Sequence, residues 1–297
     1  MLKLFNLAEH PWSEILMNFS INTVLFVSPF TNESTGLFKQ FKKWGYDAVE
    51  LLIEDPKHID PVLVKRQLEK QGLKCGSVCA AMNPDRDLRG SLRAQRKAVK
   101  YLCSLLDQMV VLNCAVLGGP IYSYVGRAEA MAPADYRRQW KAVVNNLRAV
   151  CKHAERRCKA VCFEPLNRFE TDFINTVDQG LKLIRDVKSP ALKLHVDTFH
   201  MNIEEKHPGS AIRRAGQHLR LVHACGSDRG TPGHDHTDWK DIAAALKEIG
   251  YDGDIVLESV TLDVPRIARS AAIWRRMELT HDEIASDGVK FLKRLLM

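Results

Sequence analysis

Short apolar runs rich in β-branched residues alternate along the chain with longer stretches whose apolar residues recur at the period of an amphipathic helix. Eight runs are expected to be strands: residues 21–27, 48–53, 73–80, 110–118, 160–164, 192–197, 219–223 and 254–258. Helices are expected at 36–45, 61–72, 91–109, 133–157, 176–187, 209–218, 238–250 and 282–297. Strict alternation implies parallel strands joined by right-handed crossovers, so the pattern predicts an α/β fold. Eight units favour a single closed (β/α)₈ TIM barrel over an open, doubly wound sheet.

Residues that begin and end helices stand where this alternation needs them. Asp238 and Ser210 stand at the starts of two expected helices, before Trp239 and Ala211, and their side chains can accept hydrogen bonds from the first free N–H groups. Gly45, Gly72 and Gly250 end three of the expected helices, where a left-handed residue turns the chain into the next strand. These helix starts and ends therefore indicate that the chain repeats one strand–helix unit, with no linker that would divide it into domains.

The barrel is expected to form one catalytic domain over residues 17–297, preceded at residues 1–16 by an N-terminal extension or short helix. A chain of 297 residues with 45% apolar side chains fits one barrel and excludes disorder as a description of the whole. The first residues include Glu9, His10 and Glu14, which do not suit a signal peptide, and no apolar run is long enough to cross a membrane. We therefore expect a cytoplasmic protein whose eight cysteines are reduced, buried thiols.

The formal net charge of +7 raises the question of nucleic acid binding. Pairs of basic residues are spread over the expected helices: Lys42–Lys43, Arg137–Arg138, Arg156–Arg157, Arg213–Arg214 and Arg275–Arg276. Such spacing is typical of solvated outer faces and not of a phosphate-binding track. We therefore expect neither nucleic acid nor a membrane as a partner.

Four of the expected strands end in a residue that can bind a metal ion. Glu164, Asp197, His223 and Glu258 close the last four strands, and they are separated by 33, 26 and 35 residues, one strand–helix unit each. The carboxyl ends of barrel strands meet at one mouth, where active sites of this fold are built. Three carboxylates brought together there repel one another strongly, and a divalent cation relieves that repulsion.

The nature of these four side chains indicates the kind of metal. Three oxygen donors and one nitrogen donor, with no thiolate, argue against a structural zinc site. They favour one divalent ion per subunit, with Mn²⁺ as first choice and Co²⁺ or Mg²⁺ as alternatives.

Further polar residues follow these strand ends closely. Glu170 lies six residues after Glu164, His200 lies three residues after Asp197, and Arg229 lies in the glycine-containing loop after His223. Loops at this mouth supply polar groups that hold a substrate. We expect these loops to bind the hydroxyl groups of a small molecule.

The segments EPLNRFET, HVDTFHMNIEE, HACGSDRGTPG and IVLES resemble the signature segments of the ketose 3-epimerases. That family includes D-tagatose, D-allulose (psicose) and L-ribulose 3-epimerases and lies within the xylose isomerase-like TIM barrel superfamily. The resemblance runs from about residue 17 to the C-terminus. The chain departs from the pattern at Gly226–Ser227, where relatives often have a Glu-Asn pair, and at Asn83, where a glycine is common.

The resemblance implies roles for the residues at matching positions. The metal ligands would be Glu164, Asp197, His223 and Glu258. Glu164 and Glu258 would also form the acid/base pair. The substrate-binding residues would be Glu170, His200 and Arg229. The family further suggests a small-molecule ketose as substrate and a homodimer or homotetramer as the assembly.

Epimerisation at C3 of a free ketose requires a proton to leave the carbon beside the C2 carbonyl and to return on the opposite face. A divalent ion that polarises the carbonyl favours the cis-enediolate, and two glutamates on different strands can serve as the two bases. An aldose–ketose isomerase or an inosose dehydratase on the same barrel is the nearest alternative. An abasic-site endonuclease is a more distant one.

Other residues with chemically useful side chains are interpreted more simply. His195 is interpreted as a packed core histidine, with a place behind the metal ligands as the alternative, and His234 and His236 as solvated loop residues. Phe30 is a candidate wall of an apolar pocket. The tryptophans are expected to pack in the protein instead of stacking on a sugar: Trp12, Trp44, Trp140, Trp239 and Trp274.

Overall fold

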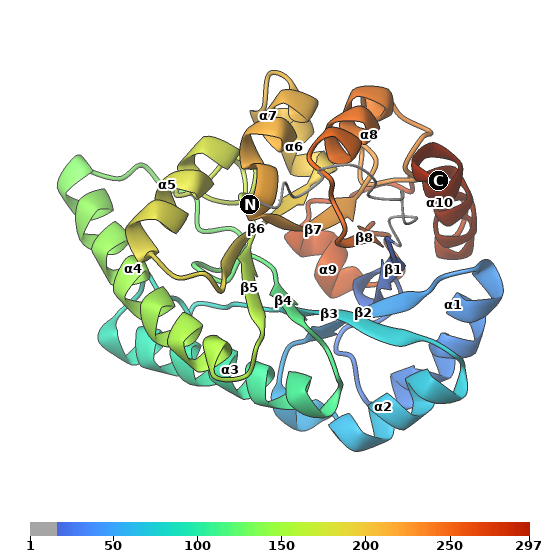
Figure 1. Ribbon diagram of the computed structural model, residues 1–297, viewed down its shortest axis with the longest axis horizontal. Helices are drawn as coiled ribbons and strands as arrows, with labels where there is room; N and C mark the ends of the chain where they lie inside the picture. The colour runs from blue at the N-terminus through green and yellow to red at the C-terminus, as the bar shows by residue number, and fades with distance from the viewer. Residues whose placement is uncertain (1–16) are drawn as a thin grey trace, which may run out of the picture.

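Eight parallel strands close into a barrel in chain order, with the first strand paired to the last (Figure 1). The structure is a computed structural model that describes residues 17–297; the prediction about residues 1–16 and Trp12 therefore lies outside the described residues. The strands are β1 Phe19–Asn22, β2 Ala48–Ile53, β3 Lys74–Ala80, β4 Val116–Gly118, β5 Ala160–Phe163, β6 Leu192–Asp197, β7 Leu219–Ala224 and β8 Asp254–Leu257. The predicted TIM barrel is confirmed.

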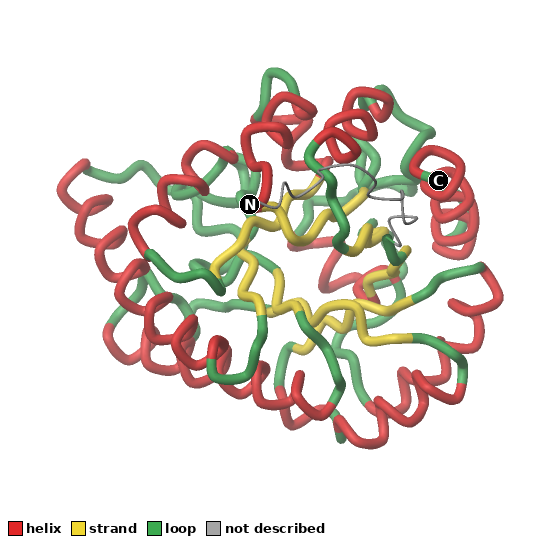
Figure 2. The backbone as a smooth tube through the Cα atoms, viewed as in Figure 1, coloured by secondary structure: helices red, strands yellow, loops and turns green. Residues whose placement is uncertain are grey.

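Most of the helices form an outer ring around the strands (Figure 2), while α9 lies inside that ring, at the mouth of the barrel (Figure 1). They are α1 Phe38–Trp44, α2 Pro61–Lys70, α3 Leu92–Val111, α4 Pro133–Glu155, α5 Val177–Val187, α6 Thr198–Glu204, α7 Pro208–Ala215, α8 Trp239–Glu248, α9 Pro265–Ser270 and α10 His281–Leu296. Short 3₁₀ helices lie at η1 Thr23–Leu25, η2 Asn32–Leu37, η3 Pro56–His58 and η4 Gly216–His218. No helix of the described residues is both long and apolar enough to cross a bilayer.

The expected helix signals mostly hold. Asp238 accepts a hydrogen bond from the N–H of Asp241 at the start of α8, and Gly45 ends α1 with a left-handed φ of 101°. Ser210 does not cap α7 as predicted. That helix begins two residues earlier, at Pro208, because proline suits the first turn, where its missing N–H costs no intrahelical bond.

Two expected strands are shorter than predicted by more than one residue. β1 stops at Asn22 because the Asn22 side chain accepts a hydrogen bond from the N–H of Val24 (2.9 Å) and starts η1 instead. In the run 110–118, Val110 and Val111 extend α3, and the chain then turns through Asn113 at a φ of 55° before β4 begins. Apolar β-branched residues do not by themselves separate the end of a helix from a strand.

Two helices were not predicted, and two basic pairs lie outside helices. α6 follows β6 directly because Asp197 ends the strand and also accepts the N–H of Phe199 (2.8 Å), while α9 lies in the segment after β8. The pair Arg156–Arg157 follows the end of α4, and Arg275–Arg276 lies in the loop between α9 and α10, where Arg276 binds Asp263.

The barrel interior changes character along its axis. Val116, Cys162, Leu221 and Val256 pack together as an apolar layer inside the barrel. Two residues further along β5, β7 and β8, the inward positions are polar, because side chains two apart on a strand point to the same side. The apolar layer therefore forms the floor below the polar mouth.

The cysteines agree with the prediction in part. All eight are free thiols, and six of them are buried. Cys103 is half-buried and Cys158 is exposed just after α4, which corrects the expectation that every thiol is buried.

Candidate active site

Four side chains meet at the carboxyl-end mouth of the barrel. Asp197 ends β6 and His223 lies in β7 as its register partner, while Glu164 and Glu258 come directly after β5 and β8. One potential ligand atom from each residue lies within 4.8 Å of the other three. The strand-end positions that look far apart in the sequence are thus side by side in space.

The pKa values of these four groups are shifted, because the groups are buried close to one another. Burial, assisted by Glu258 and Asp197, raises the pKa of Glu164 well above its usual range. Burial raises the pKa of Asp197 to about 7, even though Arg229 is close. Burial by itself would lower the pKa of His223, but the neighbouring carboxylates outweigh burial and raise this pKa. Burial by itself would raise the pKa of Glu258, but the imidazolium of His223 outweighs burial and lowers it. The cluster therefore gathers more carboxylate charge than its cations balance.

The donor set fits a divalent cation. Oε1 of Glu164 is buried and accepts no hydrogen bond from any described residue, while Nδ1 of His223 is buried and faces Oε2 of Glu258 at 3.3 Å. A buried polar atom without a partner costs free energy that a bound ion removes. Three carboxylates and one imidazole, with no thiolate among them, are ligands that suit Mn²⁺, Co²⁺ or Mg²⁺.

Sequence reasoning missed a buried network behind His223. Glu50, in the middle of β2, is fully buried, and its Oε1 lies 2.7 Å from Nε2 of His223. Asn22 donates one hydrogen bond to Glu50 (2.7 Å) and another to Glu258 (2.8 Å), while Ser77 donates to Oε2 of Glu50 (2.5 Å). A glutamate within AVELLI, an otherwise apolar strand, is the signal that would have revealed this network.

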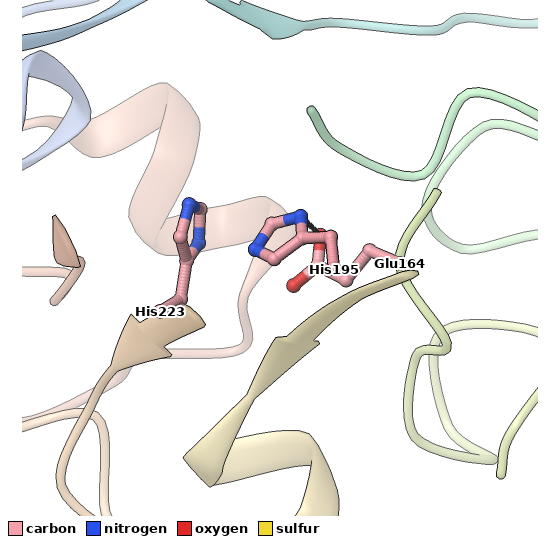
Figure 3. Close-up of side chains that lie close together, drawn as sticks. All are labelled: Glu164, His195 and His223. Atoms are coloured by element: carbon pink, nitrogen blue, oxygen red, sulfur yellow. Dashed lines mark ion pairs between the residues drawn. The ribbon is translucent and has the colours of Figure 1, made fainter. Parts of the chain in front are cut away.

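His195 lies between Glu164 and His223 (Figure 3). It is fully buried, Nδ1 accepts the N–H of Gly119 (3.3 Å), and the same nitrogen lies 3.7 Å from Oε2 of Glu164. Burial lowers the pKa of His195 well below its usual range, so the ring is neutral at pH 7. Gly118 makes room for Leu221, because a Cβ there would lie 2.6 Å from that side chain, and it would lie 3.6 Å from Nδ1 of His195. His195 is thus a packed core histidine that also touches the cluster.

The three loop residues singled out in the sequence also reach the cluster. Arg229 places Nη1 3.2 Å from Asp197 and Nη2 3.1 Å from Glu170, and its guanidinium stacks over Phe199. Nε2 of His200 lies 3.4 Å from Arg229. The guanidinium therefore joins the loops after β5, β6 and β7 into one polar surface.

Asn167 orients His200 and was not identified from the sequence. Its backbone N–H donates to Nδ1 of His200 (3.1 Å), which leaves the Nε2–H of a neutral ring to point at the cluster. Burial, and then Arg229, lower the pKa of His200 well below its usual range, so the neutral ring persists. The Asn167 side chain also donates to Glu170 (2.9 Å).

A cavity of about 330 Å³ opens onto these residues. Its polar lining includes Glu164, Glu170, His200, Arg229 and Glu258. Apolar side chains of η1, β2 and β3 and of the segments that follow β3, β4, β5 and β8 line most of the rest. Space beside two buried carboxylates, with donors opposite, suits a small polyhydroxylated molecule.

Other predicted residues lie away from this cavity. Phe30 is buried against Phe38, so the expectation that it lines a pocket is wrong. Trp140 and Trp239 are buried and Trp44 is half-buried, as predicted, but Trp274 is exposed in a loop. The histidines of the β7–α8 loop, His234 and His236, are exposed and contact Glu278 and Ser227.

Comparison with known proteins gives consistent matches. A family model described as xylose isomerase-like TIM barrel matches residues 38–295. A probable ketose 3-epimerase of Synechocystis sp. is 31% identical over 289 residues, which cover 94% of this chain and 96% of that protein.

Two solved structures share the architecture over nearly their whole length. A D-allulose 3-epimerase from Methylomonas sp. superposes with a TM-score of 0.88 at 26% identity, covering 94% of this chain and 98% of the other. A D-psicose 3-epimerase from Clostridium cellulolyticum H10, determined with D-tagatose, gives a TM-score of 0.85 at 26% identity, covering 94% and 99% of the two chains.

Proposed function

The chain belongs to the ketose 3-epimerases of the xylose isomerase-like TIM barrel family and is therefore a carbohydrate isomerase, and on this premise we propose that it epimerises free ketoses at C3. The observation that carries the proposal is the meeting of four metal-binding side chains at the barrel mouth, two of them glutamates that also line the cavity. A free ketose is favoured because the relatives of known structure were determined with D-allulose and D-tagatose.

The metal would be held by Glu164, Asp197, His223 and Glu258. When bound, a divalent cation supplies Lewis-acid polarisation of the C2 carbonyl and a template for the oxygens at C2 and C3. Mn²⁺ is the first choice for such a donor set, and Co²⁺ or Mg²⁺ would serve in the same place.

Glu164 and Glu258 would move the proton. One carboxylate takes the proton from C3, and the C–H electron pair shifts to the C2 oxygen, which produces the cis-enediolate. The other glutamate, protonated, then donates its proton to the opposite face of C3, and the electron pair returns to restore the ketone. The two side chains follow β5 and β8, so they approach a sugar in the cavity from different sides of the barrel.

Three further side chains would hold the reacting end of the sugar. Arg229 and the Nε2–H of His200 point toward the oxygens that gain charge when C3 loses its proton. Glu170, bound to both Asn167 and Arg229, would accept a hydrogen bond from the C1 hydroxyl group and so orient the C1–C2 end of the sugar. These groups are preformed, because each is already hydrogen-bonded in the protein.

Product analysis tests the proposal. The Mn²⁺-loaded protein is incubated with D-fructose, D-tagatose and L-ribulose, and with an inosose, and the products are separated by chromatography. We expect the C3 epimers of the ketoses: D-allulose, D-sorbose and L-xylulose. Formation of aldoses instead would identify an aldose–ketose isomerase, and loss of water from the inosose would identify a dehydratase. Either result, or no conversion of any ketose, contradicts the proposal.

A further inference from the structure

One carboxylate that lines the cavity, that of Glu54, lies outside the metal-binding cluster. Glu54 follows β2 and lines the same cavity as Glu164 and Glu258, but its side chain is only 8% exposed. Oε1 of Glu54 accepts a hydrogen bond from Ser28 (2.6 Å), whereas Oε2 is buried and accepts none from any residue in 17–297. An unpartnered carboxylate oxygen beside a cavity is an acceptor that a ligand hydroxyl can satisfy.

Glu54 lies across the barrel mouth from the cluster. In an eight-stranded barrel closed in chain order, β2 is opposite β6, the strand that Asp197 ends. The cavity wall beside Glu54 is apolar, because Val24, Leu52 and Cys79 of η1, β2 and β3 pack together there. A sugar held at C1 to C3 by the polar side would pass its carbon chain over this wall and bring its far end to Glu54.

The charges around the cavity favour a sugar that carries no charge at the end of its carbon chain away from C1 to C3. Among residues 17–297, four carboxylates but only two guanidiniums line it. Arg229 is already engaged by Asp197 and Glu170, and Arg266 lies 3.5 Å from Oε1 of Glu54. A phosphate at this place would face the Glu54 carboxylate without an unpaired cation from the described lining residues. A hydroxyl group, which can donate a hydrogen bond, suits Glu54 instead.

We propose that Glu54 accepts a hydrogen bond from the terminal C6 hydroxyl of a hexulose, and so selects neutral six-carbon ketoses. This inference rests on the proposed function, because it assumes that C1 to C3 of a ketose lie at the cluster. Arg86 helps to fix the backbone here, donating to the carbonyl oxygens of Glu54 (2.7 Å) and Ala81 (2.9 Å). The acceptor is therefore held in place before the sugar arrives.

A substrate-by-variant comparison tests this role. For the Mn²⁺-loaded wild type, Glu54→Gln and Glu54→Ala, kcat/KM is measured with D-fructose, 6-deoxy-D-fructose and D-fructose 6-phosphate. We expect the wild type to prefer D-fructose over its 6-deoxy analogue by roughly 10- to 100-fold, the range for a hydrogen bond to a charged group. That ratio should fall toward one in Glu54→Ala and take an intermediate value in the isosteric Glu54→Gln. The matched control Glu69→Gln, on the exposed face of α2, should keep the wild-type ratio.

Several outcomes overturn the proposal. Equal ratios in the wild type and both Glu54 variants would show that Glu54 does not sense the C6 hydroxyl, and a wild type that prefers the 6-phosphate would show the wrong substrate class. If Glu54→Ala does not fold, Glu54→Gln decides the question. If no ketose is epimerised, the proposed function fails separately. The dissociation constants of D-fructose and its 6-deoxy analogue, measured by calorimetry with the same variants, then test Glu54 on their own.

Discussion

The Glu258 carboxylate is fixed from three sides. Asn22 donates to its Oε1 at 2.8 Å, while Nδ1 of His223 lies 3.3 Å and Nη1 of Arg229 lies 3.7 Å from Oε2. These neighbours are cations or hydrogen-bond donors, so they favour the ionised form of Glu258, and its pKa lies below the usual value in spite of burial. An ionised carboxylate held this rigidly beside a cavity suits a general base.

Replacing Glu258 by glutamine should therefore remove turnover and leave the fold intact. Glutamine keeps the size and the acceptor for Asn22, but it cannot take a proton from C3. We expect kcat to fall by roughly 10²- to 10⁴-fold, the usual contribution of a general base. Steady-state kinetics measure the loss, and circular dichroism checks the fold. Activity near that of the wild type would remove Glu258 from the mechanism.

Glu50 is expected to control metal affinity through His223. Its Oε1 lies 2.7 Å from Nε2 of His223, so it favours the tautomer that carries the proton on Nε2 and leaves Nδ1 free for a metal. We expect Glu50→Gln to weaken Mn²⁺ binding roughly 10- to 100-fold. Competition with a fluorescent chelator measures this without turnover.

The control for this experiment is Glu69→Gln, an exposed change on α2 that should leave Mn²⁺ affinity unchanged. Saturating Mn²⁺ should restore most of the activity of Glu50→Gln if the residue acts by orienting His223. Wild-type affinity in the Glu50 variant would contradict this role.

At the residue scale, the place of a residue within its strand decides whether its role could be predicted from the sequence. Glu164, Asp197 and Glu258 each stand where an apolar strand stops, so their place at the mouth follows once eight strands are recognised. Glu50 lies inside a strand of fully buried residues, and its partners Asn22 and Ser77 lie on the neighbouring strands β1 and β3. Only closure of the barrel across to β7 shows that Glu50 meets His223.

The loop between β7 and α8, which carries Arg229, is organised by one carboxylate. Asp235 accepts hydrogen bonds from the backbone N–H of Ser227 (2.6 Å), from Nε1 of Trp239 (2.7 Å) and from the Thr237 hydroxyl. Burial by itself would raise the pKa of Asp235, but these donors together lower it below its ordinary value. The loop is therefore stabilised by the ionised form of this residue.

Replacing Asp235 by asparagine should destabilise the protein in a pH-dependent way. Because the folded-state pKa is below the unfolded value, the stabilisation is fully present above about pH 4 and is lost as the pH falls through the folded value. We expect a loss of about 1–2 kcal/mol at pH 7, which shrinks below pH 4. Thermal melts of wild type and Asp235→Asn at pH 7 and pH 3 measure it, and an equal difference at both pH values would contradict the assignment.

At the element scale, the sequence pattern located every strand but not every boundary. The run 21–27 is mostly apolar, yet the side chain of Asn22, one of its two polar residues, ends β1 by capping η1. α6 was missed because Asp197 was interpreted only as a strand end and a metal ligand, whereas it also caps the helix that follows. One side chain with two roles cannot be assigned from periodicity alone.

The whole molecule places a surplus of buried negative charge at one end of a rigid barrel. The apolar layer of Val116, Cys162, Leu221 and Val256 lies inside the barrel, and the polar mouth rests on it. The carboxylates cannot move apart, because each is anchored on or directly after its own strand. A bound cation should therefore stabilise the fold as well as the reaction.

Removal of the metal should lower both activity and stability. A ligand at 100 times its Kd stabilises the folded state by about 2.7 kcal/mol, so the chelator-treated protein should melt several degrees below the Mn²⁺-loaded form. Added Mn²⁺ should restore the melting temperature and turnover at one ion per chain. Undiminished turnover after complete removal of metal, checked by elemental analysis, would contradict the proposed site.

Hydrogen exchange at the substrate tests the central claim most directly. The Mn²⁺-loaded protein is incubated with D-fructose in heavy water, and proton NMR follows the C1, C3 and C4 positions of the sugar. Two glutamates acting at C3 predict deuterium at C3 of the newly formed D-allulose from the first turnovers, deuterium at C3 of D-fructose only as the reverse reaction proceeds, and no label at C1 or C4. Deuterium at C1 with C3 unlabelled, or D-allulose that retains its original C3 proton, would contradict this mechanism.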